Sequence, residues 1–253
     1  MKSIFILAKI TFQEMIREKF FIIVIFASLI LLAISLLLGS LSFAEQKRIL
    51  IDLGFAVVEL SGLGIALFSG AFLITKEIEK QTCLLLLSKP LSRGQFLVGK
   101  WLGLVFLITI TVVLLASGLF LLLQQFEYFA SFIVITISIW LKVLVLLSLV
   151  FLVSGLVRPI FSLLFGLTVY LLGHWLNDLE FFVNKTKDES LINFFKFFHE
   201  VIPQFYRFNW KAYTFLEKGI DVSQVAPMSF YLSTWSVFLL TLAVVVFRRK
   251  DIV

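Results

Sequence analysis

Few residues in this chain have side chains that perform catalysis, and their spacing matches no common catalytic or metal site. The chain contains two histidines, His174 and His199, and one cysteine, Cys83. A charged stretch separates the histidines, without the short spacing typical of zinc ligands. Ser61 and Ser154 have no histidine or acid nearby in sequence to activate them as nucleophiles. The sequence therefore predicts no catalytic residue, no metal ligand and no cofactor-binding residue in this chain.

The glycines do not indicate a nucleotide-binding loop. Gly62, Gly64 and Gly70 lie within an apolar stretch, and the complete G-x-x-x-x-G-K-[ST] pattern that holds nucleotide phosphates is absent. Glycines in such a stretch allow helices to pack closely, and Gly99-x-x-x-Gly103 has the same small-residue spacing, although this can equally arise by chance. We therefore expect that the chain does not hydrolyse ATP itself and is not an enzyme.

Two ionisable residues, Glu59 and Lys142, lie inside long apolar stretches. An unpaired charge at the bilayer centre costs about 2.5–3.5 kcal/mol on insertion scales, so each residue needs an explanation. One hypothesis is that both residues line a pathway or face each other, with Lys142 extending its side chain toward Glu59. The alternative is that the stretch around Lys142 is shifted or broken, so that this residue lies nearer the membrane surface.

The composition of the whole chain indicates where these residues lie. Hydrophobic residues make up 60% of the 253 residues, charged residues make up 15%, and the mean hydropathy is +1.06. An average soluble domain has about 25% charged residues. The apolar runs are long and continuous, whereas barrel strands alternate over about 10 residues. The predicted fold class is therefore all-α integral membrane, with a single transmembrane domain over residues 1–253.

Six transmembrane helices are expected, because each span needs about 20 mostly apolar residues. Charged boundaries place them at residues 20–38, 53–75, 101–123, 129–157, 159–176 and 229–247. Only Leu156-Val157-Arg158-Pro159 separates the fourth span from the fifth. One kinked helix is the alternative, but about 48 residues at 1.5 Å each would overshoot a bilayer, which favours a tight turn before Pro159.

The positions of lysine and arginine predict the orientation of these spans. If the N-terminus is inside, the inner segments hold the basic residues of 2–19, 76–100 and 248–250, while the short outer loops hold only Lys47 and Arg48. The long outer segment at 177–228 carries more basic residues, but acids balance them. We therefore predict a multi-pass protein of the cytoplasmic membrane in which both termini and residues 76–100 face the cytoplasm.

Residues 1–19 form a candidate amphipathic helix. One arc of this helix holds Ile4, Phe5, Ala8, Phe12, Met15 and Ile16, and the opposite arc holds Lys9, Gln13, Glu14, Arg17 and Glu18. Ile6, Leu7 and Ile10 intrude on the polar arc. A helix lying along the inner leaflet is one interpretation, and an extension of the first span is the other.

The outer segment at 177–228 predicts a second amphipathic helix. Leu191, Phe194, Phe195 and Phe198 follow helical spacing, and Pro203 ends the run. The aromatic and basic residues that follow, at 205–218, are more typical of an interfacial aromatic belt than of a nucleic-acid surface. The net charge of +6 is mostly orientation signal, and the rest is available to anionic lipid headgroups. Membrane lipids, and no nucleic acid, are the expected partners here.

The charged segment at 75–100, TKEIEKQTCLLLLSKPLSRGQFLVGK, lies between two apolar runs. Glu77 and Glu79 favour a helix, the four leucines at 84–87 supply an apolar plug, and Pro90 ends the run. A docking element for a soluble partner explains all three features. A solvated connector is the alternative, which explains the charges but not the leucines.

The pattern T-K-E-I-E-x-x-T-x-x-x-L-L-S-K-P-L-S-R-x-x-F-x-x-G-K-x-x-G at 75–103 resembles the cytoplasmic loop of type-2 ABC-transporter permeases. The ending Phe247-Arg248-Arg249-Lys250-Asp251 and the layout of the whole chain resemble the same family. Gln81 stands where many relatives have glycine. Residues 201–205, followed by Phe208-Asn209, are similar to its copper-enzyme-maturation branch.

The resemblance implies that two permease subunits pair, as a homo- or heterodimer, and that two copies of a separate ABC ATPase subunit bind ATP and Mg²⁺ beneath them. It also implies a coupling helix in the cytoplasmic loop that docks on the ATPase. The residues matched to this coupling role are Lys76, Glu77, Glu79, Thr82, Leu84, Leu85, Leu86, Leu87, Pro90 and Arg93. In the outer segment the family pattern implies re-entrant helices and an outer gate, with Phe194, Phe195, Phe198 and Pro203 as its residues.

The expected function is that of a transmembrane permease subunit of an ATP-driven transporter. Its spans are mainly apolar, which suggests a hydrophobic or amphipathic substrate, and family habit favours export. The alternative is a membrane scaffold or assembly subunit of an ATPase-linked complex, for example in metalloenzyme maturation, that transports nothing. A membrane enzyme is disfavoured because polar residues are sparse.

Overall fold

The computed structural model describes residues 2–41, 46–79, 92–123, 129–186, 189–210 and 222–249. In these ranges the regular structure is helical and contains no strand. Six of the helices are long and apolar enough to cross a membrane. The prediction of an all-α integral membrane fold is thereby confirmed.

Up to residue 79, the described residues form one short helix and two long ones. Helix α1 (Lys2–Ile16) precedes the long helix α2 (Lys19–Leu41). The next long helix is continuous and consists of α3 (Gln46–Gly64), a π-helical turn η1 (Ile65–Ser69) and α4 (Gly70–Glu79). A π-helical turn inside an α-helix is uncommon and occurs often at functional sites.

From residue 92 onward, the described residues form four long helices and two short ones. The long ones are α6 (Arg93–Leu123), α7 (Phe129–Ser154), α8 (Pro159–Thr186) and α11 (Val222–Arg249). Between α8 and α11 lie α9 (Glu189–Val201) and a 3₁₀ turn, η3 (Phe205–Phe208). The chain turns between Ser154 and Pro159, with the amide of Leu156 donating to the carbonyl of Val153 (2.9 Å), so α7 and α8 are separate helices.

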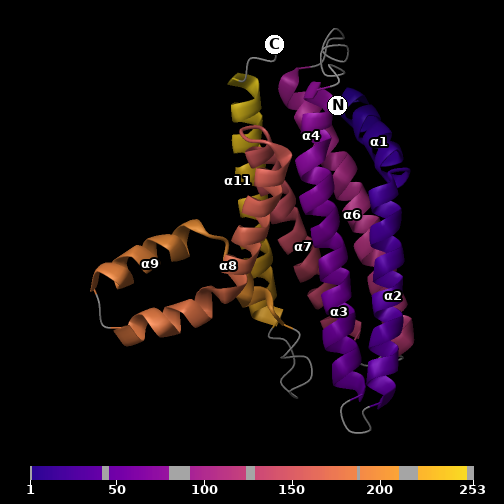
Figure 1. The fold of residues 1–253 in the computed structure, drawn as a ribbon, viewed down its shortest axis with the longest axis vertical. Helices are drawn as coiled ribbons and strands as arrows, with labels where there is room; N and C mark the ends of the chain where they lie inside the picture. The colour runs from indigo at the N-terminus through magenta and orange to yellow at the C-terminus, as the bar shows by residue number, and fades with distance from the viewer. Residues whose placement is uncertain are drawn as a thin grey trace.

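The long helices run along one bundle, and the start of α1 and the end of α11 lie at the same end of it (Figure 1). The end of α4 and the start of α6 lie at that end too, next to α1. The last part of α8 and the whole of α9 project sideways from the bundle.

Helix α7 lies at the centre of the packing. It contacts α3, α4, α6, α8 and α11, and Val143, Leu146 and Val150 are fully buried. Serine pairs add polar contacts between helices, namely Ser28 with Ser61 (2.6 Å) and Ser148 with Ser236 (3.0 Å). Such small polar side chains allow helices to approach closely and hydrogen-bond within a bilayer.

Several helices extend beyond the apolar stretches used to place the spans. Helix α3 begins at Gln46 rather than residue 53, α6 begins at Arg93 rather than 101, and α8 continues to Thr186 rather than 176. The reason is that hydropathy marks the part of a helix that suits the hydrocarbon core, whereas hydrogen bonding and capping decide where the helix itself ends.

Candidate functional site

The first candidate site is the base of the charged segment at 76–100. The structure describes its two ends, at 76–79 and 92–100. Thr82, the four leucines at 84–87 and Pro90 lie outside the described residues, as does the side chain of Glu79. The site is therefore built from Lys76, Glu77, Arg93 and the residues that contact these two ends.

The start of α6 is fixed by a capping box. The amide of Gln95 donates to Ser92 Oγ and the amide of Ser92 donates to Gln95 Oε1, both at 3.2 Å. This reciprocal pair satisfies amides that have no partner within the helix. Arg93 Nη1 donates to the carbonyl of Arg248 (3.4 Å) at the end of α11. The two motifs that carry the family resemblance are thus in contact through Arg93 and Arg248.

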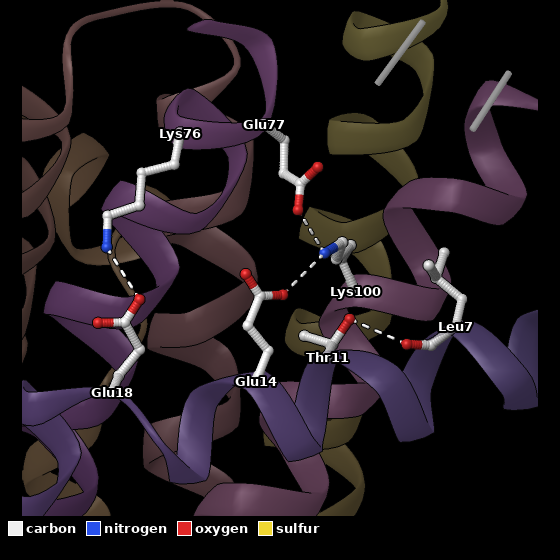
Figure 2. Close-up of polar contacts among 7 residues, drawn as sticks. All are labelled: Leu7, Thr11, Glu14, Glu18, Lys76, Glu77 and Lys100. Carbon is white, nitrogen blue, oxygen red and sulfur yellow. Dashed lines mark hydrogen bonds and ion pairs between the residues drawn. The ribbon is translucent and has the colours of Figure 1, made fainter. Parts of the chain in front are cut away.

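Lys100 forms the central ion pair of the site. Its Nζ lies 2.6 Å from Glu77 Oε1 on α4 and 3.5 Å from Glu14 Oε2 on α1. Figure 2 shows these three side chains pointing toward one another from three different helices. The Lys100 side chain is only 3% exposed. The two carboxylates therefore replace the water that an exposed ammonium group would contact.

A second ion pair lies beside the first. Lys76 Nζ on α4 lies 3.1 Å from Glu18 Oε1 (Figure 2), and both side chains are exposed. An exposed pair of this kind contributes about 0–1 kcal/mol. The two pairs bring acids near the end of α1 to basic residues on both sides of the charged segment, but the pair at Lys100 is the one that is shielded from water.

Close packing of α1 on α6 completes the site. A Cβ added at Gly103 would lie 2.6 Å from Thr11 Cβ and 2.8 Å from the Ala8 carbonyl oxygen, and one at Gly99 would lie 2.8 Å from Leu7 Cδ2. Only glycine leaves room for α1 at these positions. Gly99 and Gly103 therefore form the surface on which α1 packs. This geometry suits transmission of motion rather than covalent chemistry.

The second candidate site surrounds Glu59 inside the bundle. Lys142 Nζ on α7 donates to Glu59 Oε1 on α3, and both residues are buried, at 1% and 5% exposure. Tyr170 OH on α8 donates to the same oxygen at 2.9 Å, and His174 Nε2 lies 3.6 Å from it. Glu59 thus brings three helices together through one carboxylate oxygen.

This arrangement answers the question that the sequence left open about Lys142. The residue lies near the middle of an unbroken α7 and pairs with Glu59. The sequence did not lead us to expect Tyr170 and His174 as neighbours of Glu59. Their spacing of four residues in one span places both on one helix face, and that signal was available. A role for Glu59 and Lys142 in a substrate pathway stays a prediction.

The residues expected at an outer gate divide into two groups. Phe194 and Phe198 are exposed on α9, with ring centroids 5.0 Å apart, and Phe195 is half-buried beside His199. Pro203 is buried, and its carbonyl oxygen would be 2.6 Å from a Cβ at Gly173. Pro203 therefore fixes the return of the chain to α8, while α9 presents aromatic rings outward.

These features define a class of protein: a multi-pass helical membrane protein with a charged segment whose base contacts three helices, and with a buried polar cluster in its bundle. The chain matches the family model described as ABC-2 family transporter protein over residues 5–252, and it belongs to that family. It is a permease, the transmembrane subunit of an ABC transporter, as the resemblance predicted. Family membership in general implies an ABC ATPase partner and dimeric assembly. No curated protein matches the chain in a sequence comparison.

Proposed function

We propose that this chain moves a hydrophobic or amphipathic substrate outward across the cytoplasmic membrane, using ATP hydrolysed by a separate subunit. That subunit binds ATP and Mg²⁺ and docks on residues 76–100 from the cytoplasmic side. Two permease subunits and two ATPase subunits form the complex. The orientation follows from the basic residues at the inner ends of the spans.

One observation carries this proposal: the ion pairs of Lys100 with Glu77 and Glu14. They connect the helix before the charged segment, the helix after it and α1. A force applied to the segment therefore reaches α4, α6 and α1 together. A connector without a mechanical role does not need a buried lysine held by two carboxylates from different helices.

The proposed mechanism is mechanical. ATP binding closes the two ATPase subunits, and the apolar plug at 84–87 moves with the groove that holds it. Helices α4 and α6 then shift as near-rigid bodies, because a packed helix transmits displacement along its axis. The permease has no covalent step to perform, and the exposed rings of α9 act at the outer gate.

A co-purification experiment tests the docking part of this proposal. The chain is expressed with a candidate ABC ATPase subunit that binds it, and the leucines at 84–87 are replaced by serine. We expect the variant to lose the subunit and its stimulated ATP hydrolysis, since the plug supplies the apolar contact. Leu121→Ser with Leu122→Ser is the matched control, because these exposed leucines lie at the opposite end of α6. Retention of stimulated hydrolysis by the variant at 84–87 would contradict coupling through this segment.

Transport itself needs a separate measurement. Reconstituted complexes are assayed for ATP turnover with lipids, hydrophobic drugs and ions. We expect that a compound of the lipid or hydrophobic-drug class stimulates ATP hydrolysis and is itself moved across the bilayer. Stable binding of the ATPase subunit with no stimulation by any class would instead favour a scaffold.

A further inference from the structure

A groove of about 440 Å³ lies between α1 and α6 on the outside of the bundle. Its lining residues are Phe5, Ile6, Lys9 and Phe12 from α1 and Phe106 and Ile110 from α6. Lys9 is the only charged residue among them. The volume of the groove falls in the range of about 300–1,000 Å³ that is typical of sites for small organic ligands.

The position of the groove along α6 restricts what can occupy it. At 1.5 Å per residue, Phe106 and Ile110 lie about 20 and 26 Å along the helix from its start at Arg93. Residues 101–123 of α6 carry no charged side chain, so this wall lies within the hydrocarbon part of the helix. A soluble protein does not reach that depth, whereas the acyl chain of a lipid is already there.

The charged residues of α1 and of the turn after it indicate whether the molecule that occupies the groove is anionic or cationic. Glu14 and Glu18 pair with lysines of the bundle. No ion pair is found for Lys9 or Arg17 among the described residues, and both are exposed. The acids at 14 and 18 are thus neutralised by the bundle, and Lys9 and Arg17 remain available to an anionic group outside it. Lysine next to an apolar wall can keep its ammonium at headgroup level while its stem covers apolar surface.

We propose that this groove binds one anionic phospholipid from the leaflet on the side where α1 begins and α11 ends. An acyl chain lies against Phe12, Phe106 and Ile110, and Lys9 contacts the phosphate. On the proposed orientation this is the cytoplasmic leaflet, in which anionic lipids attract basic residues. Because α1 also forms the ion pair at Glu14, and the turn after it forms the pair at Glu18, the bound lipid stabilises the docked position of α1 beside the charged segment.

Native mass spectrometry of the purified full chain tests the site without any ATPase subunit. The probes are phosphatidylglycerol and phosphatidylcholine with identical acyl chains. We expect the wild type to retain phosphatidylglycerol preferentially, and Lys9→Glu to lower its retention at least about fivefold, since each basic residue near a membrane surface contributes about 1 kcal/mol. Lys47→Glu is the matched control, because Lys47 is exposed at the other end of the bundle.

Three results would overturn the assignment. The first is equal retention of both lipids by the wild type, and the second is unchanged retention by Lys9→Glu. The third is a covalent dimer formed through Ile110→Cys in a Cys83→Ser background, which would show a second copy of the chain in the groove. Ile110→Trp provides a further measurement: it fills the groove and should reduce retention of either lipid while the protein stays folded. Loss of lipid binding leaves the proposed transport function untouched, because the two assays share no readout.

Discussion

Glu59 and Lys142 show how a single pair decides whether charges are tolerated inside a membrane helix. Each alone would be a charge in a nearly anhydrous bundle, and together they are neutral. The same carboxylate oxygen accepts a hydrogen bond from Tyr170 at 2.9 Å. The cluster therefore joins α3, α7 and α8 at one point, close to the π-helical turn η1 in sequence.

The first prediction concerns this pair. Lys142→Leu should destabilise the protein by about 3–5 kcal/mol, because it leaves the carboxylate of Glu59 buried without its cation. The measurement is thermal unfolding in detergent. The double variant Glu59→Gln with Lys142→Leu is the control and should recover most of the loss, since no unpaired charge remains. Equal melting temperatures for wild type and Lys142→Leu would contradict the pairing.

The second prediction contrasts the two lysines beside the charged segment. Lys100→Met should lower the free energy of unfolding by about 1.5–3 kcal/mol, because its partner Glu77 is largely shielded from water. Lys76→Met removes the exposed pair with Glu18 and should lower it by at most about 1 kcal/mol. Chemical unfolding of both variants checks this. A larger effect from Lys76→Met than from Lys100→Met would be inconsistent with the burial described above.

At the level of elements, the structure excludes one of the two alternatives drawn for α1 from the sequence, and its position along the inner leaflet stays a prediction. A turn at Arg17 and Glu18 separates it from α2, so it is not a continuous extension of the first span. It packs on α6 through a face that includes Leu7, Ala8 and Thr11. Leu7 lay on the polar arc of the sequence pattern. The partner helix decides this face, because Gly99 and Gly103 offer space only there.

The third prediction tests this helix contact. Gly103→Leu should displace α1, because the new side chain would overlap Thr11 and the Ala8 carbonyl, and overpacking of this kind costs about 1–3 kcal/mol. Gly118→Leu is the matched control in the same helix, since nothing lies within 4 Å of its added Cβ.

The measurement for this prediction is the accessibility of Thr11, which is fully buried. A Thr11→Cys probe in a Cys83→Ser background should react with maleimide in the Gly103→Leu protein and stay protected in the Gly118→Leu protein. Equal protection in both proteins would mean that α1 tolerates a side chain at 103.

At the level of the whole molecule, the orientation of the bundle remains the feature on which the proposed function depends. The start of α1, the end of α11 and the base of the charged segment lie at one end of the bundle (Figure 1). They must therefore face the same side of the membrane. The distribution of basic residues predicts that this side is the cytoplasm.

The fourth prediction uses the single cysteine of the chain, Cys83. A membrane-impermeant maleimide should not label Cys83 in intact cells and should label it after permeabilisation. Lys47→Cys in a Cys83→Ser background is the control for the outer side and should react in intact cells. The reverse pattern of labelling would show that the topology is inverted, and it would exclude docking of a cytoplasmic ATPase on residues 76–100.

The sequence alone determined the class of fold and the family, and it pointed to Glu59 and Lys142 as residues that need an explanation. Long apolar runs and a charged segment are local properties, and the bilayer converts them directly into spans and a loop.

Only the tertiary structure decided which residues meet. Lys100 was counted as an orientation charge, and the spacing of Gly99 and Gly103 was equally consistent with chance, because neither residue shows its partner in sequence. The ion pairs to Glu14 and Glu77 and the surface on which α1 packs arise from helices that are far apart in the chain, and apolar periodicity carries no information about such neighbours when every side of a helix is apolar.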